Sequence, residues 1–281
     1  METILARRSV RAYDGQPLSP ADREAVLAAI AANADRVPFG TKPRFALVDD
    51  AGVPDAGPRR IGTYGLMKGA RAFVVGCVRP GPLAYVDYGY ALEGMVLEAT
   101  AAGLGTCWIG GVFDRGASGR ALRLERGEVV PAVTPVGRPA DRPALAGEVI
   151  RAMAGSTGRK PWPELFFDAG WERPLAEADA GSWAPVLEAV RRGPSASNRQ
   201  PWRVVMAAEP GGTAFHLYLR EDRAYSRAIP GVRLQDMDMG IAMRNFEEAA
   251  RCRGLPGGWA RLDKDPVPGP APLAYVASWT T

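Results

Sequence analysis

Two basic segments of the chain are suited to bind a phosphate group. The segment RRSVR (residues 7–11) follows a short apolar stretch at the N-terminus, and RKPW (residues 159–162) lies past the middle of the chain. Guanidinium groups bind phosphate through paired hydrogen bonds, and a serine hydroxyl adds a further donor. If the chain folds back, both segments can meet at one phosphate. Each alone is equally typical of a solvent-exposed helix end or of the start of a linker.

A glycine-rich segment could contact the edge of a planar ring. The run GLGTCWIGG (residues 103–111) ends in Gly110 and Gly111, where the absence of side chains lets backbone amides approach a ligand closely. Fixed amide dipoles stabilise the charge that a redox ring gains on reduction. This segment is therefore a candidate for the reactive edge of a cofactor site.

A turn-rich segment, PSASNRQPW (residues 194–202), offers hydroxyl and amide side chains between an expected helix and an expected strand. Ser195, Asn198 and Gln200 supply the donors and acceptors that the imide-like edge of a heterocycle requires. An ordinary capped loop is the alternative interpretation. The tryptophans next to these segments, Trp108 and Trp202, adjoin strand-like runs and are expected to pack in the core.

Other catalytic chemistries find little support. Cys77, Cys107 and Cys252 are too few and too widely spaced for a disulfide framework or a zinc site, so no metal is expected. His216 lies in the alternating run FHLYL, which predicts a strand and a structural histidine. Ser-His-Asp and Cys-His catalysis are therefore not expected.

Composition indicates an ordinary globular protein. The chain has 281 residues, 47% of them hydrophobic and 23% charged. Asp87, Glu93 and Glu98 interrupt the longest apolar stretch, and the N-terminus lacks the apolar core of a signal peptide. We expect a cytoplasmic protein with no membrane association. The net charge of +4 comes from basic residues scattered among acidic ones, so nucleic-acid binding is not expected.

The elements that would position these segments occur twice. Residues 87–108 align with residues 238–259 at a constant offset of 151 residues and without a gap. Both copies predict a long helix ended by glycine, Gly103 or Gly254, after a strand-like run and before a turn into another strand. Chance similarity between short Ala- and Gly-rich helices is the alternative.

A second, weaker similarity pairs residues 25–48 with residues 185–206, each predicting helix, loop and strand. We therefore expect two fused halves, residues 1–165 and residues 166–281, that form one compact unit. The first long helix is apolar on nearly all sides and should lie centrally. The second is amphipathic, with Arg244 among the side chains expected to face water.

Four motifs, RRSVRAY, GLGTCWIGG, PAVTPVGRPADRP and PSASNRQPW, resemble the nitroreductase family of FMN enzymes, and the resemblance covers most of the chain. Usual members are homodimers in which each FMN site uses both protomers. Here the first half carries RRSVR and GTCWIGG, whereas the second carries PSASNRQPW. This arrangement is similar to the single-chain branch known as TM nitroreductases. The resemblance implies an α+β, nitroreductase-like fold, an intramolecular pseudo-dimer and one FMN per chain.

The resemblance also assigns residues to the FMN site. Arg7 and Ser9 would contact the phosphate, with Arg8 beside them. Arg159 and Lys160 would help to bind the same phosphate. Arg11 would lie near the pyrimidine edge of the ring. Gly110 and Gly111 would present amides near N5 and O4. The complete implied set is Arg7, Arg8, Ser9, Arg11, Gly110, Gly111, Arg159, Lys160, Pro194, Ser195, Ser197, Asn198 and Gln200.

The implied activity is an FMN-dependent oxidoreductase that takes hydride from NAD(P)H and passes electrons to a nitroaromatic, a quinone or a similar small acceptor by a ping-pong mechanism. The flavin N5 would carry the chemistry, so no catalytic side chain is expected. The sequence lacks the G-x-G-x-x-G motif of a separate dinucleotide fold. The alternatives are another flavin reaction, such as dehydrogenation, dehalogenation or flavin remodelling, and a flavin-binding protein without catalysis. A fused pseudo-dimer is expected to be monomeric.

Overall fold

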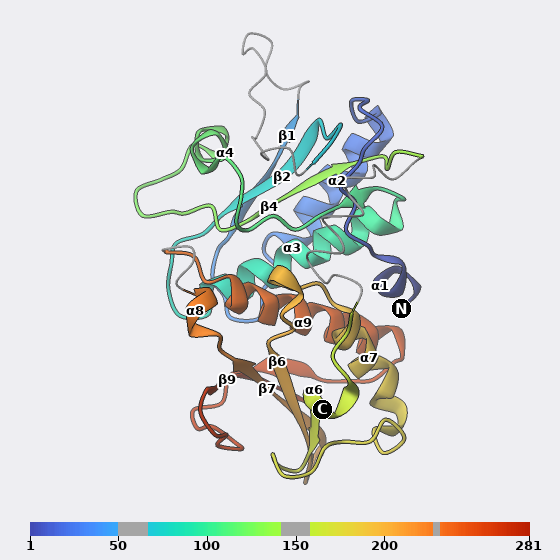
Figure 1. Ribbon diagram of the computed structural model, residues 1–281, viewed down its shortest axis with the longest axis vertical. Coiled ribbons are helices and arrows are strands. Elements are labelled where there is room, and N and C mark those ends of the chain that lie inside the picture. The colour runs from blue at the N-terminus through green and yellow to red at the C-terminus, as the bar shows by residue number, and fades with distance from the viewer. Residues whose placement is uncertain (50–66, 142–157, 227–230) are drawn as a thin grey trace.

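The computed structural model describes residues 1–49, 67–141, 158–226 and 231–281. Two long helices, α3 (Ala84–Ala101) and α9 (Leu234–Cys252), pack against each other in the middle of the molecule, with a sheet on either side of them (Figure 1). The expected α+β class is confirmed.

Each half contributes one sheet, and antiparallel pairing dominates in both. The first sheet has the order β1-β2-β4-β3 and the second has the order β5-β6-β7-β9-β8, in which only β5 pairs in parallel. The strands are β1 (Arg44–Asp49), β2 (Ala72–Cys77), β3 (Gly105–Thr106), β4 (Val133–Gly137), β5 (Phe166–Asp168), β6 (Trp202–Glu209), β7 (Gly212–Arg220), β8 (Gly258–Ala260) and β9 (Leu273–Thr280).

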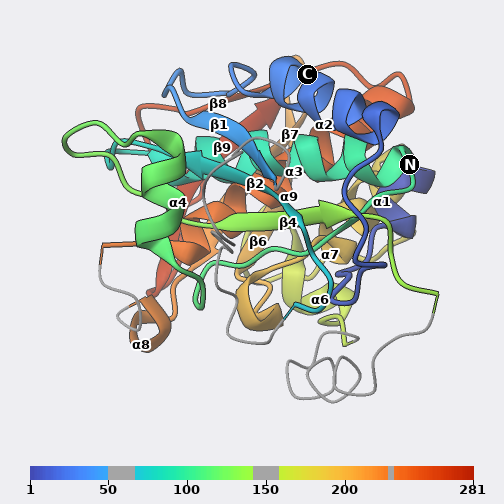
Figure 2. The same cartoon turned by 90° about the horizontal axis from the view of Figure 1, so that it is seen from above.

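Shorter helices connect the strands. Ser19 caps α2 by accepting a hydrogen bond from the amide of Asp22, and Asp114 caps α4 by accepting one from the amide of Ala117. In Figure 2, α4 and α1 lie on opposite sides of the molecule. The helices are α1 (Glu2–Ala6), α2 (Pro20–Asn33), α4 (Arg115–Leu122), α6 (Trp162–Leu165), α7 (Ala184–Arg192) and α8 (Arg223–Ser226), with 3-10 turns η2 (Gly181–Trp183) and η3 (Ala196–Asn198).

The two halves follow the same order of elements. In each, a helix (α2 or α7) precedes the first long strand (β1 or β6), and a central helix (α3 or α9) follows the second (β2 or β7). Both central helices end at a glycine with positive φ, Gly103 at 74° and Gly254 at 67°. These glycines are the predicted helix ends, and only glycine adopts this left-handed conformation at little cost.

The central helices contact each other through a reciprocal pair of glycines. A Cβ atom at Gly89 would overlap the carbonyl oxygen of Met237, and one at Gly240 would overlap the carbonyl oxygen of Val86. Gly89 matches Gly240, and Val86 matches Met237, at the same offset of 151 residues. A contact in which matched residues exchange places is the geometry of a two-fold axis.

Burial of the central helices follows the prediction for α3 and differs from it for α9. Nearly every residue of α3 is buried. Arg244 of α9, expected to face water, is only 2% exposed, because it donates to Asn33 from α2 and pairs with Glu248. Its guanidinium also lies over the ring of Tyr90. Contacts with the first half therefore bury a side chain that helical periodicity alone assigns to the surface.

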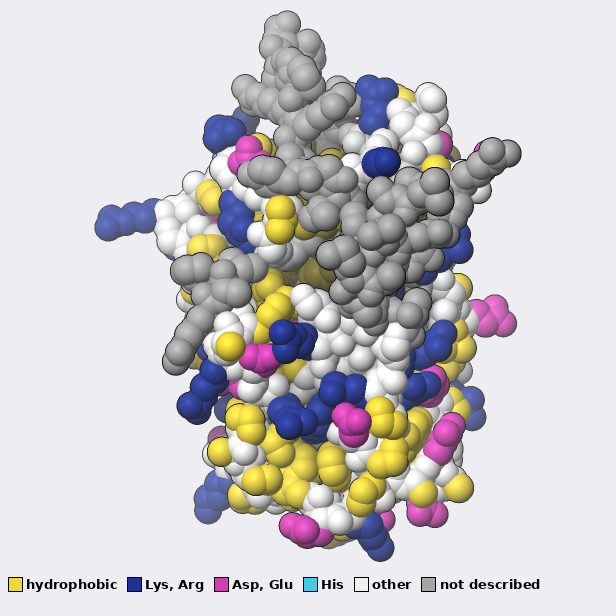
Figure 3. All heavy atoms as spheres, in the orientation of Figure 1, with side chains coloured by type: hydrophobic (Ala, Val, Ile, Leu, Met, Phe, Trp, Pro, Cys, Tyr) yellow, Lys and Arg dark blue, Asp and Glu magenta, His cyan; other side chains and the backbone are white. Residues whose placement is uncertain are grey.

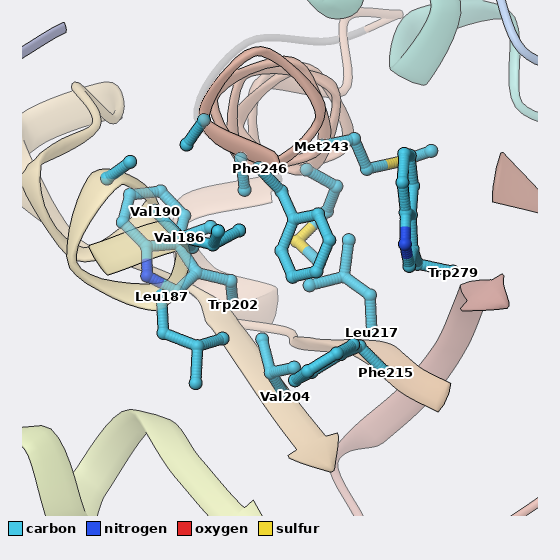
Figure 4. Close-up of a cluster of buried hydrophobic side chains, with 14 of the residues drawn as sticks. Val186, Leu187, Val190, Trp202, Val204, Phe215, Leu217, Met243, Phe246 and Trp279 are labelled. Atoms are coloured by element: carbon cyan, nitrogen blue, oxygen red, sulfur yellow. The ribbon is translucent and has the colours of Figure 1, made fainter. Parts of the chain in front are cut away.

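The core of the second half is built around aromatic side chains. Phe246 of α9 packs against Phe215 of β7 and Trp279 of β9, and Trp202 of β6 is fully buried in the same cluster (Figure 4). Trp202 is therefore a packing residue, as predicted. None of the helices within the described ranges is long and apolar enough to cross a membrane.

Candidate functional site

A cavity of about 790 Å³ lies where the two halves meet, a size typical of small-molecule sites. Its walls come from the N-terminal segment, from the glycine-rich segment after β3, from the loop before β6 and from the first turns of α9. Lys and Arg side chains gather across the middle of the face shown in Figure 3. The cavity therefore combines elements that are far apart in sequence.

The N-terminal wall is fixed by bridges to neighbouring segments. Helix α1 ends at Ala6, with Arg7 at its C-cap, and Ser9 then pairs with Thr106 of β3. The amide of Val10 donates to the Thr106 carbonyl at 2.8 Å. These bonds lay the arginines and the serine of RRSVR along the cavity, beside the glycine-rich segment.

Arg159 reaches the cavity from the segment that precedes α6. Its guanidinium donates to the side chain of Asn198 at 2.8 Å and to the carbonyl of Arg192 at 3.1 Å. Burial, together with the nearby charges of Arg7, Arg192 and Arg191, lowers the pKa of Arg159 to about 10. Cations that destabilise one another in this way make the wall attractive to an anion.

The loop before β6 is held in a tight conformation. Ser197, Asn198 and Gln200 all have positive φ, between 48° and 53°, which is uncommon for residues with a Cβ atom. The hydroxyl of Ser195 accepts from the Gln200 amide at 2.9 Å, and the carboxylate of Asp238 accepts from the Ala196 amide at 2.9 Å. These bonds hold Pro194, Ser195, Ser197 and Asn198 in the cavity wall.

Two of the expected cofactor contacts do not lie in this wall. Gln200 is 3% exposed, and its side chain accepts from the Lys160 amide at 2.8 Å and donates to the Asn198 carbonyl at 3.1 Å. The ammonium of Lys160 lies 3.3 Å from Glu164. Both residues thus join the segment that precedes α6 to the loop before β6 and hold Arg159 in place.

The glycine-rich segment forms the opposite wall. Gly110 and Gly111 both line the cavity. A Cβ atom at Gly110 would lie 2.5 Å from the side chain of Leu234, so a larger residue would not fit without movement. Trp108, expected only to pack in the core, packs against the core and also lines the cavity.

Two buried carboxyl groups at the cavity were not identified as site residues from the sequence. Asp238 lines the cavity, its second oxygen makes no hydrogen bond to the described residues, and burial raises its pKa far above the usual range. Glu93 lies behind Trp108, accepts from the indole N–H at 2.8 Å, and has its pKa raised by burial to about 7. The sequence signal that could have identified both is an acidic residue within an otherwise apolar stretch of a predicted helix.

Asp87 and Asp238 occupy matched places in the two halves. Asp87 accepts from the amides of Phe39 and Thr41, at 3.1 and 2.9 Å, in the loop that precedes β1. Asp238 accepts from Ala196 in the loop that precedes β6. The first residue of each aligned copy therefore binds the equivalent loop of its own half.

The remaining candidate residues have structural surroundings. His216 is buried on β7, where its Nδ1 lies 2.8 Å from the Ser278 hydroxyl, as expected for a structural histidine. Cys107 lines the cavity, but burial raises the pKa of its thiol. Among the described residues, no group of three or more His, Cys, Asp and Glu side chains is arranged to hold a metal ion.

Comparison with known proteins gives one family match. The family model described as "Putative TM nitroreductase" matches residues 1–250. Among solved structures, a protein of Thermotoga maritima named as a nitroreductase candidate aligns with a TM-score of 0.60 and 16% sequence identity, and the alignment covers 99% of this chain and 91% of that one. The two chains therefore share a fold over nearly their whole length.

Smaller structures align with about half of the chain. A nitroreductase with bound FMN from Bacteroides fragilis has 27% identity and a TM-score of 0.39, with coverage of 51% of this chain and 90% of that one. An FMN-dependent nitroreductase from Clostridium difficile has 20% identity and a TM-score of 0.41, with the same coverage. The curated proteins contain no significant match.

Proposed function

This chain belongs to the "Putative TM nitroreductase" family, and from that premise we propose that it is an FMN-dependent oxidoreductase. Its electron donor would be NAD(P)H, and its acceptor a nitroaromatic, a quinone or a similar small molecule. Bound FMN would supply hydride transfer at its N5 atom. The nitroreductases with FMN among the aligned structures agree with this proposal.

The observation that carries the proposal is the cluster of guanidinium groups at the cavity. Arg7, Arg159 and Arg192 all line it, and burial together with the charges of Arg7 and Arg192 lowers the pKa of Arg159. A phosphate dianion would relieve this repulsion and accept several charge-assisted hydrogen bonds. The hydroxyl of Ser9 would add a further donor.

The other walls fit the remainder of FMN. Ser195, Ser197 and Asn198 would face the ring from the second half, with Pro194 packed beside them, while Gly110 and Gly111 would face it from the first half. Arg11 would lie near the pyrimidine edge, where a cation stabilises an anionic reduced ring. Lys160 and Gln200 would support this site by holding the loop rather than by touching FMN. Donor and acceptor would use the open face of the ring in turn.

We further propose that the chain is an intramolecular pseudo-dimer of residues 1–165 and residues 166–281. The shared strand order and the reciprocal Gly89 and Gly240 contacts support an ancestral two-fold interface now enclosed in one chain. Such a protein would be monomeric, and a cytoplasmic location is part of the same proposal.

One FMN per chain follows from the differences between the halves. The loop of the first half that corresponds to PSASNRQPW contains Phe39 and Thr41 and lacks the Ser-Asn-Gln set. The second half has no RRSVR-like segment, and GGWARLD (residues 257–263) replaces GTCWIGG. The missing parts are complementary, so only one complete site would remain.

The first test is the visible spectrum and the flavin-to-chain ratio of the purified protein, followed by anaerobic NADH or NADPH. A ratio near one with bleaching by either donor supports the proposal. A ratio of two contradicts the single site, and no binding even after FMN is added contradicts the function.

The phosphate contacts are tested with the double variant Arg7→Ala and Arg159→Ala. Each charge-assisted hydrogen bond contributes roughly 1.5–3 kcal/mol, so the dissociation constant of FMN should rise at least about 100-fold. Arg253→Ala, an exposed arginine outside the cavity lining, is the control and should bind FMN normally. Equal affinity of the double variant and the wild type would contradict the assignment.

A further inference from the structure

An arginine outside the expected set contacts both glycines of the cavity wall. Arg115 is the first residue of α4, and its side chain turns back along the loop that precedes the helix. Its Nη2 donates to the Gly110 carbonyl at 2.5 Å, and its Nη1 donates to the Gly111 carbonyl at 3.4 Å. One guanidinium therefore holds two consecutive peptide groups.

The charge of Arg115 is not neutralised by a carboxylate. Among the described residues, none forms an ion pair with it; the oxygen of the adjacent Asp114 instead accepts from the Ala117 amide at 2.8 Å. The guanidinium lies 4.4 Å from the centre of the Phe113 ring, and its Nε is buried without a hydrogen bond. Burial lowers the pKa of Arg115, which shows that its cationic form is incompletely solvated.

The N–H groups of the same two glycines have no acceptor in the described part of the chain, although the neighbouring Ile109 exchanges both backbone bonds with Val133. The Gly111 N–H belongs to the same peptide group as the Gly110 carbonyl, which Arg115 holds, whereas the Gly110 N–H belongs to the peptide group of the Ile109 carbonyl, which Val133 holds. Arg115 therefore fixes the orientation of the Gly111 amide, in the cavity wall that both glycines line.

We propose that Arg115 is a positioning residue that orients the Gly111 amide and adds positive potential at the reactive edge of the redox cofactor. This inference rests on the proposed function, since it assigns the N5 and O4 edge of FMN to this wall. A half-buried cation behind a backbone amide stabilises negative charge more than it stabilises a neutral ring. Arg115 should therefore favour reduced over oxidised FMN.

The electrostatic part is tested with Arg115→Gln, Arg115→Lys and the control Arg120→Gln, which removes an exposed charge from the same helix. Arg115→Gln should weaken binding of reduced FMN about tenfold more than binding of oxidised FMN, the size expected for one charge-assisted hydrogen bond. That ratio corresponds to a midpoint potential lower by about 30 mV for a two-electron couple. Arg115→Lys should recover part of the shift, and Arg120→Gln should show none.

A purely structural role for Arg115 would weaken both redox forms equally and leave the potential unchanged, and this outcome would overturn the electrostatic part. The positioning part is measured separately, on the FMN-free protein, by ¹⁵N relaxation of the Gly111 amide. In Arg115→Gln its order parameter should fall from about 0.85 to below about 0.6, with Arg120→Gln unchanged. A rigid Gly111 amide in Arg115→Gln would refute positioning. Failure of the wild type to bind FMN would instead refute the proposed function.

Discussion

Replacing Glu93 with glutamine should remove a loss of stability that the wild type suffers as the pH rises from about 5 to 8. Glu93 is fully buried on α3, where Trp108 donates to one of its oxygens and Asn245 lies beside it. Arg7 and Arg244 favour its charged form, but the cost of desolvation is larger and raises its pKa from 4.5 to about 7.

The sign follows from proton binding. The folded protein keeps the Glu93 proton up to about pH 7, whereas the unfolded chain releases it near its ordinary pKa of 4.5. Stability is therefore unaffected below pH 4.5, falls between the two values, and is lowest above pH 7. Each pKa unit corresponds to 1.36 kcal/mol, so the full loss is about 3 kcal/mol, of which about 2 to 3 kcal/mol lies between pH 5 and pH 8.

The measurement is urea unfolding of FMN-free wild type and Glu93→Gln at pH 5 and pH 8. The slope of the free energy of unfolding against urea concentration should be the same for both proteins at both pH values. Glutamine keeps the acceptor for Trp108 and has no charge. The free energy of unfolding of Glu93→Gln, relative to that of the wild type, should therefore be about 2 to 3 kcal/mol higher at pH 8 than at pH 5. Glu98→Gln, an exposed change on the same helix, controls for net charge. Parallel pH profiles for wild type and Glu93→Gln would refute the reasoning.

Three further predictions concern packing, the matched aspartates and the cysteines. Gly240→Ala should lower the free energy of unfolding by about 1–3 kcal/mol, because its new Cβ atom meets the backbone of α3. The control Gly258→Ala has space for a Cβ atom and should change the free energy little. Equal urea midpoints of the two variants would contradict the helix contact. Asp87→Ala and Asp238→Ala should both lower the free energy of unfolding by about 1–3 kcal/mol, because each removes the acceptor of a loop amide. Only Asp238→Ala should weaken FMN binding in a fluorescence titration, because Asp238 lines the cavity. Equal FMN affinities of the two variants would argue against a single site. An aromatic disulfide reagent should modify one thiol per native chain, that of the exposed Cys252. Rapid modification of all 3 thiols would contradict the burial of Cys77 and Cys107.

Local patterns in the sequence were sufficient for the elements and for most of the cavity wall. Gly103 and Gly254 end the two long helices as predicted, because a left-handed residue is a strong local requirement. The alternating run around His216 is a strand, and RRSVR follows a short helix. The sequence also identified Trp202 as a packing residue, since a bulky aromatic beside a strand belongs in a core.

The sequence alone also identified the four segments, but their roles depended on what each side chain meets. Gln200 was expected at the cofactor; its side chain accepts from the Lys160 amide, and it is not among the residues that line the cavity. Arg244 is buried because a partner from α2 lies across from it. Helical periodicity describes one helix and contains no information on what packs against it.

The sequence by itself determined which residues are chemically suited to the site and which elements carry them, because helix ends, strand alternation and glycine conformation depend on near neighbours in the chain. Only the tertiary structure decided that residues 7–11, Arg159 and the loop before β6 surround one cavity, and that Glu93, Asp238 and Arg115 belong beside it. The meeting of these segments at one cavity and the burial of these side chains both arise from contacts between segments far apart in sequence. Burial, not residue type, gives the Glu93 and Asp238 carboxyl groups their raised pKa values.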